Sequence, residues 1–530
     1  MGYVEMNFVV IDNYGRKPPI SVNTAYLSVD NWNDYSFITM FYLTIFDKAG
    51  VEHEIGNVKI AFKGQTTEKS TYTTLGEGFS FLNDQYFSLG TTTEYYKNLN
   101  KLPPELKQNI LTALEDIVYK PEKLKDIEDE EVLNTSLFRG VTLSDVHGQF
   151  SRVLSGLAEL SDFDFNFVRQ GLDGFCNLKI PFKVKVGSIP STNIHAFIGR
   201  NGCGKTTILN GMIDAITNPE HESCIFTESS LFNESRIPSG YFRSLVSVSF
   251  SAFDPFTPPQ EQPDPAKGTR YFYIGLKNRE NSEALNSLGD LRKDFVSALI
   301  GCLSNEGKKD LWLDAISSLS SDQNFENMGL SILNTRYVSL KEKHKNIQID
   351  NNRFEELFYQ DITNYLQRMS SGHAIVLFTI TRLVNNVGEK SLVLLDEPEG
   401  HLHPPLLSAF LRTLSDLLYI KNGVAIIATH SPVVLQEIPK SCVWKVIRSR
   451  EAIIVERPEI ETFGENFGVL TREVFSLEVA NSGYHSLLTK SVESGATYDE
   501  ILLEYMNQIG LEGRTVLKAM VLSRDAKKAQ

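Results

Sequence analysis

The chain of 530 residues lacks most features that mark secreted, membrane-embedded or disulfide-rich proteins. Its five cysteines are scattered without a CxxC pair, which argues against both a disulfide framework and a zinc knuckle. No run of about 18 apolar residues occurs, and the polar N-terminus does not have the pattern of a signal peptide. Acidic residues outnumber basic ones by 66 to 52, and this net charge of −14 disfavours general electrostatic coating of nucleic acid. We therefore expect a cytoplasmic protein of several domains, with no membrane partner.

The most informative stretch is residues 193–217, NIHAFIGRNGCGKTTILNGMIDAIT, whose pattern predicts a strand, a glycine-rich turn and a helix. The turn fits GxxxxGK[ST], in which glycines let backbone N–H groups and a helix N-terminus point at phosphate oxygens. Lys205 is expected to neutralise the β and γ phosphates, and Thr206 to offer its hydroxyl to Mg²⁺. The predicted nucleotide-binding residues of this turn are Gly199, Asn201, Gly202, Gly204, Lys205, Thr206 and Thr207.

Two more apolar runs end in chemically useful side chains. The run 392–395 has the pattern of a strand covered on both faces and delivers Asp396 and Glu397 at its C-terminal end. Adjacent carboxylates at that edge suit a Mg²⁺ ligand, Asp396, and a water activator, Glu397, although ordinary helix-capping acids are the alternative. The run GVAIIATHSP places His430 at a similar edge, where it is a candidate sensor of the γ-phosphate or a structural histidine.

A polar tetrad, 370–373, precedes an apolar helical run in QRMSSGHAIVLFTI. Taken alone, Ser370, Ser371 and Gly372 would be a helix N-cap. The four motifs together, in this order and spacing, resemble those of the ABC-type ATPases. In that family the signature motif of one subunit reaches the γ-phosphate bound by another, which implies ATP, Mg²⁺ and a homodimer or higher even oligomer formed through the ATP sites.

Two departures from the family pattern concern the signature and the glutamine-bearing loop. The signature has Met369 and His373 where LSGGQ is usual, and Ser251 stands where the loop's glutamine is expected, with Gln260 farther along. The residue that couples Mg²⁺ to the helical lobe is therefore left open.

Several segments point to a subfamily. No sustained heptads separate the phosphate loop from the signature, which argues against a long coiled coil. The phrase DEPEGHLHP resembles overcoming-lysogenization-defect nucleases and related bacterial defence ATPases, but no DxD pair follows Ser431, so no nuclease is expected in this chain. The length, the segment SFSAFDPF and the helical tail are similar to the PtuA ATPases of Septu anti-phage systems, including retron-associated versions.

That resemblance implies a regulatory ATPase that controls a separate, PtuB-like HNH nuclease subunit. Next to a retron it also implies a reverse transcriptase with its msDNA. A RecF/Rad50-like DNA-repair ATPase that acts directly on DNA is the alternative, and a transporter motor is third.

The expected fold is α/β: an ABC-type P-loop ATPase head with an N-terminal antiparallel β subdomain, a helical insertion and C-terminal helices. Alternating residues in 35–63 predict a hairpin, either in the sheet that this family lays over the nucleotide base or in a separate adaptor domain. The expected divisions are 1–170 (N-terminal segment of the first lobe), 171–260 (P-loop core), 261–365 (mainly helical insertion), 366–460 (signature, Walker B and switch histidine) and 461–530 (C-terminal helices).

The segment KGTRYFYIGLK combines cationic and aromatic residues. Lys267, Arg270 and Lys277 are candidates for contact with nucleic acid or with the nuclease subunit. The alternative is an ordinary strand with Tyr271 and Tyr273 on one face.

Overall fold

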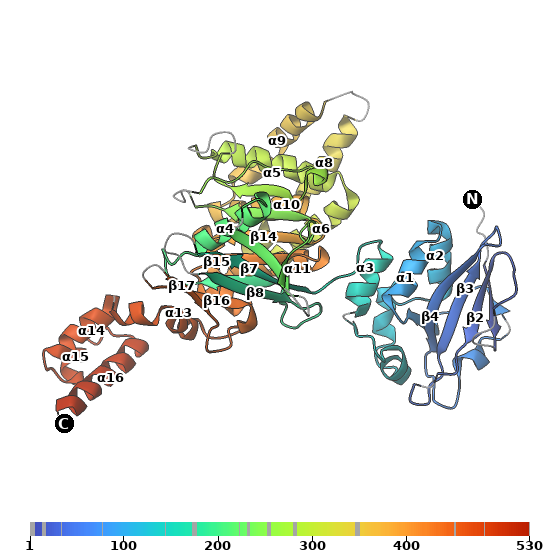
Figure 1. The fold of residues 1–530 in the computed structure, drawn as a ribbon, viewed down its shortest axis with the longest axis horizontal. Helices are drawn as coiled ribbons and strands as arrows, with labels where there is room; N and C mark the ends of the chain where they lie inside the picture. Colours follow the sequence, from blue (N-terminus) through green and yellow to red (C-terminus); the bar gives the residue numbers. More distant parts are fainter. Residues whose placement is uncertain are drawn as a thin grey trace. The chain divides into compact units, whose positions relative to one another are not determined.

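The computed structural model describes the chain except residues 1–5, 13–16, 33, 77, 144, 172–176, 222, 230–233, 252–255, 279–283, 345–349, 450–451, 482 and 529–530. It divides into two compact units, Met1–Ser161 and Asp162–Gln530 (Figure 1). Cys176 and half of SFSAFDPF, residues 252–255, lie outside the described residues, whereas the four described cysteines are free and buried, as expected of reduced thiols.

The N-terminal unit is built on a six-stranded sheet of order β5-β1-β2-β3-β4-β6. Strands β3 and β4 form the predicted hairpin, with Phe41 opposite Val58. All pairs are antiparallel except β1 with β2. The strands are β1 (Asn7–Ile11), β2 (Thr24–Val29), β3 (Met40–Phe46), β4 (Glu52–Phe62), β5 (Gly78–Phe79) and β6 (Tyr86–Gly90), and the helices are α1 (Thr93–Asn100), α2 (Pro104–Ala113) and α3 (Ser151–Leu154).

This unit has its own core, in which Phe41, Leu43 and Ile45 of β3 pack with Tyr95 and Tyr96 of α1. Its described strands pair only with one another. The hairpin is therefore part of a separate domain, the alternative that the sequence left open. Its end at Ser161 also corrects the expected boundary at residue 170, because the next strand pairs within the second unit.

The second unit is organised around a seven-stranded sheet of order β13-β12-β14-β15-β9-β16-β17. Neighbours are parallel except β16 and β17. The chain order of these strands is far from their order in space, as in doubly wound α/β folds. The strands are β9 (Ile194–Ile198), β12 (Ser244–Ser249), β13 (Arg270–Gly275), β14 (Ser391–Asp396), β15 (Val424–Thr429), β16 (Val443–Ser449) and β17 (Ala452–Glu456).

Each central strand of this sheet is buried on both faces. In β14, Leu392 and Leu394 face one core, while Val393 and Leu395 face the other. Successive side chains of a strand point to opposite faces, so an uninterrupted apolar run serves both cores. Helix α4 (Lys205–Thr217) covers the first face, and helices of the insertion, α10 (Ser371–Asn386) and α11 (Pro404–Ile420) cover the second.

A four-stranded antiparallel sheet, ordered β11-β10-β7-β8, lies on the α4 side. Phe165 and Phe167 of β7 share a core with Met212 of α4. This sheet, rather than the N-terminal hairpin, is the antiparallel sheet of the ATPase unit. Its strands are β7 (Phe163–Arg169), β8 (Leu178–Val184), β10 (Cys224–Ser229) and β11 (Glu234–Arg236).

The insertion begins later than expected. Residues 270–275 form β13, an edge strand of the central sheet paired in parallel with β12, so the stretch from 261 belongs to the core before the helices start. The helices that follow are α5 (Leu288–Leu303), α6 (Glu306–Leu319), α7 (Gln323–Met328), α8 (Ile332–Lys343) and α9 (Asn351–Gln367).

The chain after β17 is helical, as predicted. Leu488, Ile501 and Leu517 form a small core of their own near the C-terminus. Among the described residues, no helix combines the length and apolar character that crossing a bilayer requires. The remaining helices are α12 (Pro432–Gln436), α13 (Phe467–Asn481), α14 (Gly483–Glu493), α15 (Tyr498–Glu504) and α16 (Leu511–Lys528).

Candidate functional site

The glycine-rich turn joins β9 to α4, as the sequence predicted, and two of its glycines are required by space. A Cβ on Gly199 would lie 2.4 Å from the carbonyl oxygen of Val446. Gly204 has a φ of 104°, and a Cβ there would lie 2.7 Å from the Ile453 side chain. The turn is therefore held tightly against β16 and β17, while Asn201, Gly202 and Thr207 remain exposed.

Lys205 is buried at the first position of α4 and folds back over the turn. Its ammonium donates to the carbonyl oxygens of Gly199 at 3.0 Å and Arg200 at 3.1 Å. A buried cation held inside a ring of backbone groups is suited to bind phosphate oxygens. The exposed members of the predicted set are Asn201, Gly202 and Thr207.

Thr206 and Asp396 meet, although 190 residues separate them in the chain. The threonine hydroxyl lies 2.9 Å from Oδ2 and 3.1 Å from Oδ1 of the aspartate. Adjacent ligands of octahedral Mg²⁺ with bonds of about 2.1 Å lie about 3 Å apart. The two side chains therefore have the spacing and the oxygen chemistry that Mg²⁺ requires.

Glu397 and His430 follow the ends of neighbouring strands, β14 and β15. Glu397 has a left-handed backbone, with φ of 45° and ψ of 57°, and its N–H donates to the Ala428 carbonyl at 2.8 Å. Nδ1 of His430 lies 3.6 Å from Oε1 of Glu397, and both side chains are about 40% exposed. A carboxylate and an imidazole thus stand side by side next to Asp396, within reach of water.

Glu399, which the sequence did not single out, holds His430 in place. Its Oε1 accepts hydrogen bonds from the Thr429 hydroxyl at 2.6 Å and the His430 N–H at 2.7 Å, and it lies 3.2 Å from His430 Nδ1. The side chain is only 7% exposed. The third acid of DEPE was the available signal, but a single glutamate in a polar turn does not reveal a partner 31 residues away.

The signature residues divide between two roles. Ser370 is the N-cap of α10, and its hydroxyl lies 2.6 Å from Nδ1 of the buried His373. Ser371 is exposed at the first helical position, whereas Gly372 is buried. Ser370 therefore serves its own helix, and Ser371 faces outward, as a residue aimed at another subunit must.

The loop after β12 contacts α10 through residues that the sequence did not predict. Arg382 of α10 donates to Oε1 of Glu261 at 3.1 Å and to the Tyr273 carbonyl at 3.1 Å. Gln260 is exposed, and neither it nor Ser251 is among the lining residues of the pocket beside Asp396.

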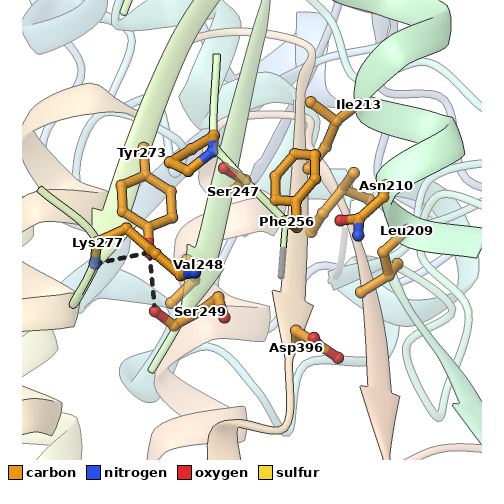
Figure 2. Close-up of a pocket in the computed structure, with 12 residues that line it drawn as sticks. Leu209, Asn210, Ile213, Ser247, Val248, Ser249, Phe256, Tyr273, Lys277 and Asp396 are labelled. Atoms are coloured by element: carbon orange, nitrogen blue, oxygen red, sulfur yellow. Dashed lines mark hydrogen bonds between the residues drawn. The ribbon is translucent and has the colours of Figure 1, made fainter. Parts of the chain in front are cut away.

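That pocket is shown in Figure 2. It lies between α4 and the ends of β12 and β13, with Asn210, Ser249, Phe256 and Asp396 among its lining residues. The bond between Arg382 and Glu261 thus connects α10 to the loop that lines this pocket beside Asp396.

The cationic stretch at 267–277 forms an ordinary strand, as the alternative interpretation predicted. Tyr271 and Tyr273 of β13 are both buried in the core on the α4 side. The Tyr271 hydroxyl lies 2.8 Å from that of Ser247. Lys267 is exposed and Arg270 half-buried, and their contact with nucleic acid or a nuclease remains a prediction.

A curated relative aligns with almost the whole chain. Protein ea59 of Escherichia phage lambda is 65% identical over 525 residues, which cover 99% of this chain and 100% of ea59. This chain belongs to the ea59 family. Every motif described above therefore lies within the part of the chain that ea59 shares.

A family model described as "AAA domain, putative AbiEii toxin, Type IV TA system" matches residues 280–436. The matched part runs from the helical insertion through the signature, Asp396, Glu397 and His430. With the phosphate loop on β9 and α4, this ea59-family chain has the fold of an ABC/AAA-type P-loop ATPase.

Solved ATP-binding cassettes of ABC transporters overlap with part of the ea59-family chain. The ADP conformation of MJ1267 is 15% identical and covers 57% of this chain and 93% of its own, with a TM-score of 0.27. A nucleotide-free cassette is 15% identical and covers 61% of this chain and 100% of its own, with a TM-score of 0.28. At these scores, the details of the site rest on the geometry of this chain alone.

Proposed function

We propose that this chain is an ATP-binding and ATP-hydrolysing regulatory subunit that dimerises around ATP and controls a separate HNH nuclease subunit in an anti-phage defence complex. The contact between Thr206 and Asp396 carries the ATPase part, because it joins the phosphate loop to the strand end that also bears Glu397. Phosphoryl transfer is catalysed mainly by positioning and electrostatics, and such a cluster supplies both.

Each side chain has a distinct part in that reaction. Lys205 moves its hydrogen bonds from the turn carbonyls to the β- and γ-phosphate oxygens. When bound by Thr206 and Asp396, Mg²⁺ supplies charge neutralisation at the same oxygens. Glu397 orients or deprotonates the attacking water, and His430, held by Glu399, stabilises the charge that develops.

Dimerisation is the part of the proposal supported by the start of α10. Ser371 and the N–H groups of the first turn are suited to bind an anion, and the exposed serine is available to a second subunit. A γ-phosphate bound by one copy would be capped by the other, which makes assembly depend on ATP. This arrangement turns the nucleotide into a switch for a partner.

The defence role is supported by the type of relatives. The description of the matched family model names the AbiEii toxin of a type IV toxin–antitoxin system. The relative ea59 is encoded by a phage. An ATPase of this kind, if carried by a prophage as ea59 is carried by a phage, would serve to exclude competing phages. The HNH nuclease, resembling PtuB, and a retron reverse transcriptase with its msDNA are the proposed partners.

The experiment is co-expression of the chain with the products of its neighbouring genes, followed by purification through a tag on this chain. We expect a nuclease subunit to copurify, and phage plating to recover when Lys205→Ala or Glu397→Gln is introduced. A chain that purifies alone, with unchanged phage plating whether or not it is expressed, would refute the defence role.

A RecF/Rad50-like ATPase that acts directly on DNA is the second candidate, favoured by the phage origin of ea59, since phages replicate and recombine their genomes. Hydrolysis measured with and without duplex DNA distinguishes the two. Strong stimulation by DNA alone would favour this candidate over the nuclease-regulating one.

A further inference from the structure

Three possible metal ligands from distant parts of the chain meet at the base of the signature helix. Asp322 is the N-cap of α7, His373 lies in the first turn of α10, and His403 is the N-cap of α11. One ligand atom from each of the three lies within 4.8 Å of the others. His373 is the last residue of the signature segment, whereas Asp322 and His403 lie outside the nucleotide site described above.

The carboxylate of Asp322 faces both imidazoles. Its Oδ1 lies 3.4 Å from Nε2 of His373, and its Oδ2 lies 3.8 Å from Nε2 of His403. Asp322 and His373 have side chains less than 10% exposed, whereas that of His403 is 46% exposed. The cluster is therefore anchored in the protein on two sides and open to solvent on the third.

The hydrogen bonds around the cluster leave the right atoms for a metal. The Ser370 hydroxyl lies 2.6 Å from Nδ1 of His373 and can fix the tautomer whose Nε2 carries a lone pair, as outer partners of metal-bound histidines do. Backbone N–H groups of Asn324 and Phe325 donate to Asp322 at 3.0 and 3.1 Å and keep its carboxylate oriented. His403 accepts from the Leu406 N–H at only 3.4 Å, a weak bond that its exposed ring can give up.

The spacing also suits a tetrahedral ion. Ligand atoms about 2.1 Å from a tetrahedral Zn²⁺ lie about 3.4 Å from one another. Oδ1 of Asp322 already lies at this distance from Nε2 of His373. The other oxygen, Oδ2, is the one that lies 3.8 Å from Nε2 of His403, so an ion bound through one oxygen requires the carboxylate or the exposed His403 ring to turn. Two imidazoles and one carboxylate are a donor set for Zn²⁺ or a similar transition ion, whereas Mg²⁺ prefers oxygen alone.

We propose that Asp322, His373 and His403 form a binding site for a divalent transition-metal ion of the Zn²⁺ class, with a fourth position open to water. The ion ties the start of the signature helix to the segment that follows Glu397 and to the helical insertion. Bound metal therefore stiffens the region from which Ser371 projects. The site binds its ion whether or not the chain hydrolyses ATP.

The test uses the full chain, stripped with a chelator and then titrated with ZnCl₂ alone in the absence of nucleotide. Bound zinc is counted by mass spectrometry of the elements, and Co²⁺ is added in parallel because its visible spectrum reports tetrahedral nitrogen and oxygen ligation. We expect one tightly bound ion per chain. Asp322→Asn and His403→Asn should each weaken affinity more than about 100-fold, since even loss of an outer partner costs 10- to 100-fold.

The variants are matched to the structure, because asparagine can replace aspartate or histidine as an N-cap and so keeps α7 and α11 capped. The control is His221→Asn, which removes an exposed histidine 3.2 Å from Asp214 but outside the cluster. Circular dichroism and melting of each variant show whether it is folded. Two results would show that the cluster is only a hydrogen-bonded ion pair. One is an unchanged zinc stoichiometry in both cluster variants. The other is a wild-type chain that binds no more zinc than these variants and gives no tetrahedral Co²⁺ spectrum.

Discussion

Replacing Glu399 by glutamine tests whether His430 depends on a buried carboxylate. Glutamine keeps an oxygen where Oε1 lies but removes the negative charge. The Thr429 hydroxyl and the His430 N–H would keep their acceptor, at 2.6 and 2.7 Å in the native chain, while the imidazole would lose an anion 3.2 Å away. We expect slower ATP turnover with nearly unchanged ATP binding, because Glu399 supports the reaction and does not touch the phosphate loop.

The size of the effect follows from the hydrogen bonds. Bonds to a charged acceptor contribute about 1.5–3 kcal/mol and neutral ones about 0.5–1.5 kcal/mol, so two weakened bonds cost about 2 kcal/mol. The side chain is 7% exposed, so solvent screens this difference little. If the whole cost appears in the transition state, turnover falls about 30-fold. Any part of this free-energy cost that destabilises the folded chain, rather than the transition state, lowers the melting temperature instead.

The assay is steady-state phosphate release at saturating ATP and Mg²⁺, with nucleotide affinity measured separately by equilibrium binding. Thr429→Ala removes one of the two donors to Oε1 and should have about half the energetic effect. Glu437→Gln, at the end of α12, is the charge-matched control and should behave as wild type. Wild-type turnover in Glu399→Gln, or equal losses in binding and turnover, would refute the positioning role.

Three further predictions can be checked with similar measurements. Glu397→Gln should keep ATP binding and lower turnover by about 100-fold or more, the usual contribution of a general base; equal hydrolysis would remove Glu397 from this role. Mixing Lys205→Ala with Ser371→Arg chains should restore part of the ATPase activity that each homodimer lacks, since one mixed site keeps both native groups; no recovery would contradict a shared site. Burial raises the pKa of Asp116 to about 7 from 3.8, so its stabilising effect is full below pH 3.8 and is lost as pH rises through 7. Asp116→Asn should therefore stabilise the N-terminal unit at pH 8 by up to about 4 kcal/mol relative to wild type and not at pH 4, as measured by denaturant unfolding at each pH.

The parts of the site that the sequence predicted are those encoded in local patterns. A glycine-rich turn of this spacing between an apolar strand and a helix is specific for phosphate binding, and the positions of Lys205 and Thr206 follow from it. Asp396, Glu397 and His430 were found because a parallel sheet gathers the ends of buried strands at one edge. The gathering of strand ends at one edge does not give the distances between these side chains, because the distances depend on the pairing register of β14 and β15.

The parts that the sequence missed depend on contacts between remote segments. Glu399 and Asp322 are single acids in polar turns, and their partners are 31 and 51 residues away. The strand β13 was one of two predicted alternatives, but its position at the edge of the central sheet was missed, because that position depends on pairing with β12. The predicted end of the N-terminal domain, residue 170, was too late. Strand β7 continues the alternation of apolar and polar residues seen in the earlier strands, yet it pairs with β8 and β10 of the second unit.

The native contacts around the phosphate loop indicate how ATP can drive a change of state. The Lys205 ammonium is bonded to the turn carbonyls, and the Thr206 hydroxyl is bonded to Asp396. In the proposed function these groups bind the phosphates and Mg²⁺, so the ligand would exchange partners within the site rather than add to free ones. Each hydrogen bond given up offsets about 1 kcal/mol of the binding energy. Asp396 is the last residue of the buried strand β14 and precedes the turn that carries Glu397 and Glu399, so such an exchange would act next to the residues that position His430.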